Sequence, residues 1–243
     1  FSRVDDPSGA VLLTVRPDGV PVTEFVAGQY VSIGVTMPDG ARQLRQYSLV
    51  NKPGSHELTF AVKPVAATAE QPAGEVSSWI AANVCVGDIL DVTVPFGDLP
   101  APTGERPLVL ISAGIGITPM IGLLEALVAD APSTTVRVLH ADRCDQSHPL
   151  RERQRELLAA LPNATLDIWY EDGLTGGAPG VHAGLLTLDG IELPAAWRAT
   201  FPEQSLGKSL VSLAAAERRL GEQHHDSRLR SIRAKSDGRA SRR

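Results

Sequence analysis

Four consecutive residues, Arg45, Gln46, Tyr47 and Ser48, carry hydrogen-bonding or stacking side chains within RQYSLV, a stretch that otherwise has a strand pattern. Side chains alternate along a strand, so Arg45 and Tyr47 are expected on one face and Gln46 and Ser48 on the other. A solvent-facing side explains one polar pair but not both. The pattern therefore favours a strand that binds a flat, polar and partly anionic ligand.

The sequence ISAGIGITPM, residues 111–120, places a glycine-rich turn after an apolar run. We expect a strand to end at Ser112 and a helix to begin at Thr118-Pro119, because threonine is a good N-cap and proline suits the first helical position. Such a turn, at the carboxyl end of a parallel strand, can bind a phosphate through the helix amides. Any tight strand-to-helix turn also needs glycine, and Thr-Pro replaces the third glycine of the ordinary Rossmann pattern.

A third stretch, GEVSSW at residues 74–79, combines Gly74 with two serines near the start of a helix predicted over residues 75–84. Glycine permits a close approach of the backbone, and a helix amino terminus attracts anions. A capped helix without any ligand explains the same residues equally well.

The elements that position these stretches change character along the chain. Up to about residue 100, short apolar alternations at residues 10–15, 29–35, 43–50, 57–62 and 89–94 are separated by turn sequences such as PDG and NKPGS. Closely spaced short strands indicate an antiparallel barrel or sandwich. After the proline-rich segment LPAPTGERP, strands predicted at 107–112, 135–141 and 164–172 alternate with helices at 119–131 and 149–162. This alternation predicts a parallel sheet with crossover helices.

We therefore predict a β + α/β architecture. An antiparallel β-barrel domain spans residues 1–102, and an incomplete α/β domain with three evident parallel strands spans residues 103–194. Residues 195–243 form a third segment, in which 11 Lys and Arg stand against 5 Asp and Glu, whereas residues 1–194 hold 12 against 23. We expect this basic segment to be disordered. It lacks the interleaved aromatic residues that would favour nucleic-acid binding.

The composition of the 243 residues, 43% hydrophobic and 21% charged, is that of a globular protein. The sequence contains no apolar run of about 18 residues, so no membrane-spanning helix is predicted. Its first residues do not show the pattern of a signal peptide. The two cysteines, Cys85 and Cys144, are far apart and lack neighbouring metal ligands, so we expect reduced thiols, no metal site and a cytoplasmic location. His140 is interpreted as a polar residue at a strand end rather than a general base.

Taken in order, these stretches resemble the ferredoxin–NADP reductase superfamily and, within it, the reductase half of flavohaemoglobins. The resemblance covers residues 8–193 and includes AGQYVSI, RQYSLV, FAVK, GEVSSWI, VGDILDVTVPFGDL, ISAGIGITPM, HADR and LDIWYED. It implies FAD in the barrel and NAD(P)H in the second domain. It also implies electron transfer from NADH through FAD to a one-electron acceptor, such as a haem or globin domain or an iron–sulfur protein.

The resemblance also implies roles for individual residues. Arg45 would hold the flavin diphosphate, Tyr47 would pack on the isoalloxazine and Ser48 would lie near its reactive N5, which makes Tyr47 and Ser48 the catalytic candidates. Further residues implied to bind the flavin are Tyr30, Gln46, Lys63, Gly74, Glu75, Val76 and Ser77. Those implied to cradle the nicotinamide nucleotide are Gly114, Ile115, Gly116, Ile117, Thr118 and Pro119.

The sequence departs from the family at both ends. Nothing globin-like precedes Phe1, and after Leu193 the family's Cys-Gly-Pro strand, helix and last strand are not recognised. A reductase component of an oxygenase, a free flavin reductase and a truncated chain with little activity therefore stay open as alternatives. NADH is favoured over NADPH, because Asp142 and Asp145 would repel the 2′-phosphate that Arg143 could bind.

Overall fold

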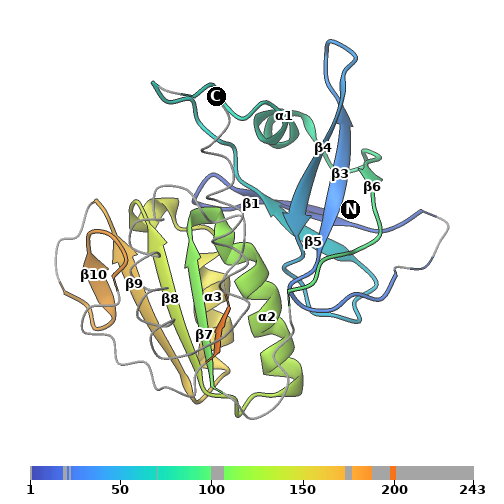
Figure 1. Cartoon of the computed structure of the whole chain (residues 1–243). Coiled ribbons are helices and arrows are strands. Elements are labelled where there is room, and N and C mark those ends of the chain that lie inside the picture. The colour runs from blue at the N-terminus through green and yellow to red at the C-terminus, as the bar shows by residue number, and fades with distance from the viewer. Residues whose placement is uncertain are drawn as a thin grey trace, which may run out of the picture.

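The computed structural model consists of two sheet-containing units (Figure 1) and describes residues 2–18, 21, 23–69, 71–99, 107–172, 177–187 and 198–200. The first unit holds two three-stranded antiparallel sheets, ordered β1-β2-β5 and β4-β3-β6. Their strands are β1 (Ser2–Asp5), β2 (Val11–Val15), β3 (Tyr30–Thr36), β4 (Arg42–Ser48), β5 (Leu58–Val62) and β6 (Asp91–Val92). A bridge between Leu49 and Phe60 joins the two sheets.

The core of the first unit follows from strand alternation and one helix. Val31 and Ile33 of β3 are fully buried against Phe60 of β5. Helix α1 (Glu75–Asn83) adds Val76 and Ile80 from its buried face, as its helical spacing predicts. The predicted antiparallel β domain is confirmed, although the strand expected at 89–94 is limited to Asp91–Val92, which pairs with β3. Strand β1 was not predicted, because SRVD lacks apolar alternation.

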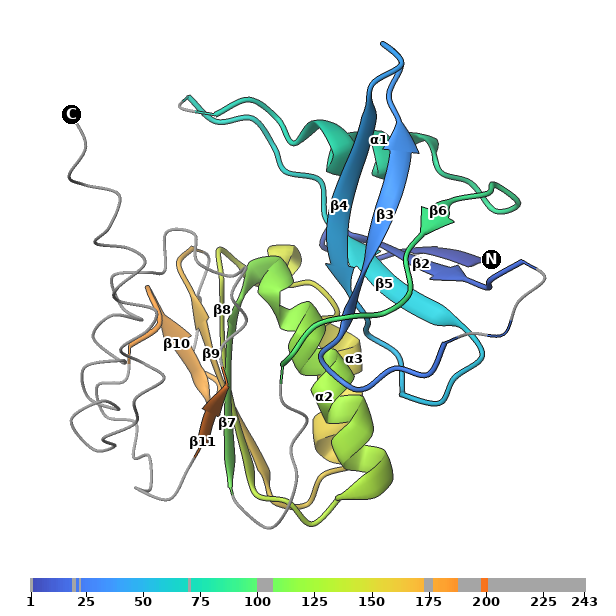
Figure 2. The same cartoon turned by 45° about the vertical axis from the view of Figure 1, so that its right-hand side comes forward.

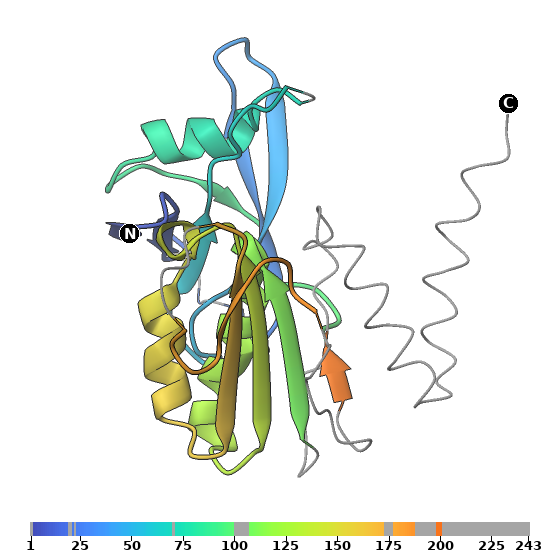
Figure 3. The ribbon, with the colours of Figure 1, turned by 90° about the vertical axis from the view of Figure 1, so that its left-hand side faces the viewer.

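The second unit is a five-stranded parallel sheet with the order β10-β9-β8-β7-β11. Helices α2 (Ile117–Asp130) and α3 (Arg151–Ala159) lie on the same side of this sheet (Figures 2 and 3). The strands are β7 (Leu108–Ala113), β8 (Val136–Asp142), β9 (Ala164–Tyr170), β10 (Val181–Ala183) and β11 (Arg198–Thr200).

Two findings correct the predicted sheet. The three expected strands are β7, β8 and β9, but β10 pairs with β9 and adds a fourth strand beyond it. Strand β11 lies within the segment predicted to be a disordered tail, yet it pairs in parallel with β7. Both added strands have three residues, too few to show an alternation in the sequence. The rest of the predicted tail and the predicted boundary at residue 102 lie outside the described residues.

One apolar cluster spans the two units. Ala27, Val50 and Ala61 of the first unit pack in the same cluster as Met120 and Leu124 of α2. Within the described ranges, no helix is both long enough and apolar enough to cross a membrane.

Candidate functional site

The predicted ligand-binding strand is β4, which pairs with β3 so that Tyr47 lies opposite Val31 and Ser48 opposite Tyr30. Arg45 is exposed, and its guanidinium Nη1 donates to the carbonyl of the adjacent Leu44 at 2.8 Å. No carboxylate of the described residues lies within ion-pair distance of Arg45. Its positive charge is therefore available to an anionic ligand.

Two tyrosines are fixed by packing beside this strand. The Tyr47 ring stacks on Phe60 with a centroid distance of 5.7 Å, and burial raises the pKa of Tyr47 to about 12 although the Arg45 charge opposes the shift. The Tyr47 hydroxyl therefore stays protonated and can donate a hydrogen bond at physiological pH. Tyr30 contacts the Phe96 ring at 4.3 Å. Their half-buried rings and Ser48 suit a flat aromatic ligand.

The start of α1 lies near the same strand. An added Cβ at Gly74 would lie 2.7 Å from Ser77 Oγ and 2.8 Å from Val65 Cβ, so this position requires glycine. Gly74 also offers no side-chain acceptor to the amides of the first helical turn, which leaves them for an anion. Glu75 Oε2 accepts from Gln43 Nε2 of β4 at 3.4 Å, which ties the helix start to β4.

The structure thus brings Arg45, Gln46, Tyr47 and Ser48 of β4 together with Tyr30 of β3, and connects the start of α1 to β4. Of the α1 residues, Val76 is 1% exposed, so only its backbone is left for a ligand. Ser77 Oγ already forms hydrogen bonds within the first unit: it donates to the Gly74 carbonyl at 3.2 Å and accepts from the Val65 amide at 3.3 Å. These residues fit a planar cofactor with an anionic tail.

The glycine-rich turn has a different geometry from the one expected. Strand β7 continues to Ala113, Gly114–Gly116 form a single 3₁₀ turn, and α2 begins at Ile117 with Gly116 as its N-cap. The predicted N-cap role of Thr118 is therefore wrong. Its buried hydroxyl donates to the Ile115 carbonyl at 3.0 Å, and Pro119 lies within the first turn, where a missing N–H costs nothing.

Gly114 makes the turn suitable for close approach of a ligand. Its φ of 50° lies in the left-handed region, which favours glycine, and no atom lies within 4 Å of the position of an added Cβ. The turn follows the carboxyl end of a parallel strand, where α/β sheets bind their ligands. Gly114, the partly exposed Ile115 and the amides that open α2 therefore fit a nucleotide phosphate.

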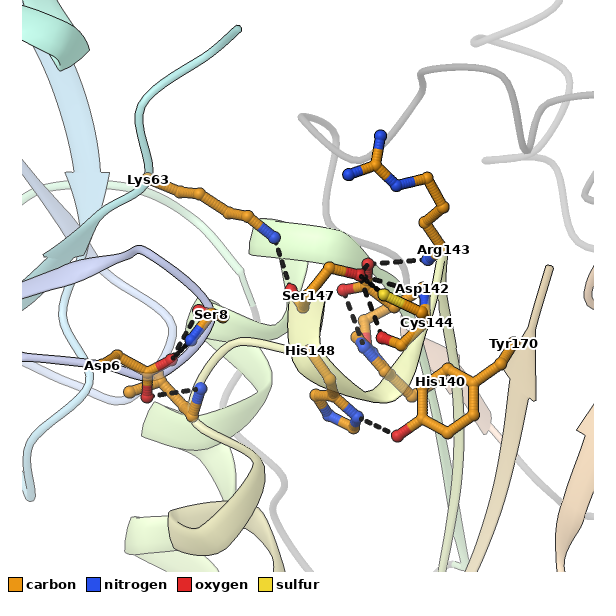
Figure 4. Close-up of polar contacts among 12 residues, drawn as sticks. Asp6, Ser8, Lys63, His140, Asp142, Arg143, Cys144, Ser147, His148 and Tyr170 are labelled. Atoms are coloured by element: carbon orange, nitrogen blue, oxygen red, sulfur yellow. Dashed lines mark hydrogen bonds and ion pairs between the residues drawn. The ribbon is translucent and has the colours of Figure 1, made fainter. Parts of the chain in front are cut away.

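A polar cluster that the sequence did not reveal lies at the carboxyl ends of β7, β8 and β9 (Figure 4). His140 is fully buried within β8 rather than at its end, which corrects its predicted role. Its Nδ1 lies 2.8 Å from Ser112 Oγ, and its ring stacks on His148 at 4.0 Å. His148 Nδ1 lies 3.0 Å from the Tyr170 hydroxyl. These partners come from separate elements, so no short motif could have indicated the cluster.

Charge and burial oppose each other in this cluster. Burial lowers the pKa of His140, against the opposing effect of Asp142. Burial lowers the pKa of His148 to about 2, and His140 adds to the shift. Burial opposes the ionisation of Asp142, but the nearby His140 ring, the hydrogen bond from Ser147 and the charge of Lys63 together lower the pKa of Asp142. At neutral pH the cluster therefore contains two neutral imidazoles and one carboxylate.

Comparison with known proteins identifies the family. Residues 110–180 match the family described as the oxidoreductase NAD-binding domain. Flavohemoproteins from Bordetella pertussis and Oceanobacillus iheyensis are 40% and 37% identical over 158 and 160 residues. These alignments cover 63% and 65% of this chain but 38% and 39% of the relatives, so the chain spans well under half of their length.

A solved structure decides the assignment. The flavohem-like FAD/NAD-binding domain of nitric oxide dioxygenase from Vibrio cholerae O1 biovar El Tor is 30% identical, with a TM-score of 0.73 over 85% of this chain and 87% of that one. The chain belongs to the family of flavohaemoprotein FAD/NAD-binding domains. Flavohemoglobin from Malassezia yamatoensis, solved with bound FAD and heme, has a TM-score of 0.74 at 26% identity over 90% of this chain and 55% of that one.

Membership of the flavohaemoprotein FAD/NAD-binding family confirms the predicted enzyme class, an FAD-dependent NAD(P)H oxidoreductase. It also confirms FAD and a nicotinamide dinucleotide as the family's cofactors. The roles assigned above to single residues remain predictions.

Proposed function

We propose that this chain takes electrons from NADH through FAD and delivers them singly to a haem or another one-electron acceptor. The contact between α2 and the end of β4 carries the proposal. An added Cβ at Gly122 would lie 2.6 Å from the carbonyl oxygen of Leu49, which directly follows Ser48. Gly122 lies about 8 Å along the helix from Ile117, where α2 begins. The predicted nicotinamide turn and the predicted flavin strand are therefore close, as hydride transfer requires.

The first unit would hold FAD through cationic and amide groups at the diphosphate and aromatic groups at the isoalloxazine. The Arg45 guanidinium and the amides at the start of α1 would neutralise the diphosphate, because charge-assisted bonds to phosphate are strong. The half-buried Tyr47 ring, backed by Phe60, would cover one side of the isoalloxazine and exclude water. Tyr30 and Ser48, opposite each other in the β3–β4 ladder, would border the ring.

The second unit would hold the nicotinamide nucleotide at the Gly114–Gly116 turn. The left-handed Gly114 lets the backbone approach a phosphate, and the start of α2 supplies amide donors and a partial positive charge. A bound flavin supplies the redox chemistry, accepting a hydride and releasing its two electrons singly. The residues of this chain supply binding, orientation and exclusion of water.

We propose NADH rather than NADPH as the donor. The Asp142 carboxylate is fixed at the end of β8, where it accepts from the Arg143 amide at 2.7 Å and stays ionised. A carboxylate there repels a 2′-phosphate. The exposed Arg143 side chain points away from this cluster (Figure 4). Equal rates of flavin reduction by NADH and NADPH would contradict this preference.

Anaerobic reduction tests the proposed function. The purified chain is loaded with FAD and mixed with NADH in a stopped-flow instrument, and bleaching of the flavin band is expected. Ferric globin or a [2Fe–2S] ferredoxin is then added, and the return of the flavin band shows which of them accepts the electrons. A chain that binds FAD but is not bleached by NADH would contradict the proposal and favour a truncated, inactive product.

A further inference from the structure

The segment between β8 and α3, residues 143–150, here called the coupling loop, is held firmly by the second unit. Ser147 Oγ donates to Asp142 Oδ1 at 2.5 Å. His148 is 2% exposed and lies between the His140 ring and the Tyr170 hydroxyl. The loop is therefore anchored to the carboxyl edge of the parallel sheet, beside the predicted nucleotide turn.

Within the described residues, two hydrogen bonds join the same loop to the first unit (Figure 4). Lys63 Nζ, just after β5, donates to the Ser147 carbonyl at 2.5 Å. Asp6 Oδ2, in the turn after β1, accepts from the Leu150 amide at 3.2 Å. Leu150 has φ of 55°, an unfavourable conformation for leucine that the surrounding contacts must hold.

Charge strengthens the contact across the two units. The Lys63 ammonium is close enough to the buried Asp142 carboxylate to lower the pKa of Asp142. Asp142 Oδ2 has no hydrogen-bond partner in the described residues and lies 3.8 Å from His140 Nε2. His140 in turn contacts Ser112, two residues before Gly114. A continuous set of contacts thus runs from Lys63 to the start of the glycine turn.

We infer that the coupling loop is a latch that fixes the two cofactor sites relative to each other. Lys63 and Asp6 are then positioning residues for hydride transfer, and Lys63 acts on Ser147 rather than on the flavin. This inference rests on the proposed function. The shared core around α2 keeps the units together when the latch is lost, so folding and binding of each cofactor survive. The distance between the rings is then less well defined, and hydride transfer is sensitive to such misplacement.

Two variants of the full chain, Lys63→Met and Asp6→Asn, test the latch. Exposed Lys52→Met and Asp18→Asn are the matched controls on the same unit. FAD content and the half-saturating NADH concentration should stay at the wild-type values in all four. The limiting rate of flavin reduction should fall about tenfold or more in Lys63→Met, less in Asp6→Asn, and not in the controls. Lys63→Arg should recover part of the rate, because it keeps a cationic donor.

Hydrogen exchange of the cofactor-free chain gives a readout independent of activity. Peptides covering residues 143–150 should exchange faster in Lys63→Met than in wild type, while peptides from β7 and β8 stay unchanged. Unchanged exchange in the coupling loop would overturn the latch. Loss of FAD with an unchanged rate per bound flavin would make Lys63 a flavin ligand instead. A wild-type chain that NADH does not reduce would refute the proposed function, whereas the exchange result would still decide whether the latch exists.

Discussion

Mild acid should destabilise this chain through His148. The side chain is 2% exposed, and burial lowers the pKa of His148 from an ordinary 6.5 to about 2. His140 of β8 and Arg151 and Arg155 of α3 also oppose its protonation, whereas Asp142 favours it. The folded chain therefore keeps His148 neutral at any pH above about 3.

The sign and size of the effect follow from linkage. The unfolded chain takes up a proton at His148 below pH 6.5 and the folded chain does not, so the free energy of unfolding decreases as the pH falls from 6.5 towards 2. At about pH 5, roughly 1.5 units below the ordinary value, one such histidine removes about 2 kcal/mol. The lowered pKa of the fully buried His140 acts in the same direction. The pKa of Asp142 is lowered in the folded chain, so ionised Asp142 stabilises the fold, and this stabilisation is lost only when the pH falls below the ordinary carboxyl range.

Urea unfolding at about pH 7.5 and about pH 5, followed by tryptophan fluorescence, measures the difference. His148→Gln removes the titrating group, so its loss of stability between the two pH values should be smaller than that of wild type by about 2 kcal/mol. His56→Gln, at an exposed histidine, is the matched control and should keep the wild-type difference. If His148→Gln loses as much stability in acid as wild type does, His148 is not kept neutral by burial and the reasoning fails.

Substitutions at three further positions test the proposed sites. Arg45→Ala should lower FAD affinity about tenfold or more, because a hydrogen bond to a charged group contributes about 1.5–3 kcal/mol. Arg45→Lys should restore only part of the affinity, because the planar guanidinium is lost. Equal FAD occupancy of wild type and Arg45→Ala after gel filtration would rule out Arg45 as a ligand of the diphosphate. Gly114→Ala adds a Cβ to a residue with φ of 50°, a left-handed conformation that costs about 1–2 kcal/mol for alanine. It should weaken NADH binding in a titration while FAD stays bound. A parallel loss of both ligands would indicate damage to the fold instead. Gly122→Ala places a Cβ 2.6 Å from the Leu49 carbonyl oxygen. We therefore expect the free energy of unfolding in urea to fall by about 1–3 kcal/mol and flavin reduction to become slower. Wild-type values for both would show that the contact between the units is not tight.

Much of the fold could be predicted because its signals are local. Apolar alternation located β2, β3 and β5, and short apolar runs located β7, β8 and β9, since the period of side chains along a strand is a property of the strand itself. The glycine turn at residues 114–116 was found for the same reason, because left-handed backbone favours one residue type. The exact start of α2 was wrong, because Thr118 and Pro119 are also compatible with the interior of a first turn.

The sequence by itself determined the order of a β unit and an α/β unit, the strand RQYS and the turn that follows β7, because each depends on neighbouring residues. Only the tertiary structure showed that Lys63 reaches Ser147, 84 positions away, and that His140 is buried against His148. Likewise, β10 and β11 are too short to be recognised from their sequences, and only their pairing with the longer strands β9 and β7 identifies them. These contacts depend on how separate elements pack, and no periodicity along the chain encodes which side chains meet across them.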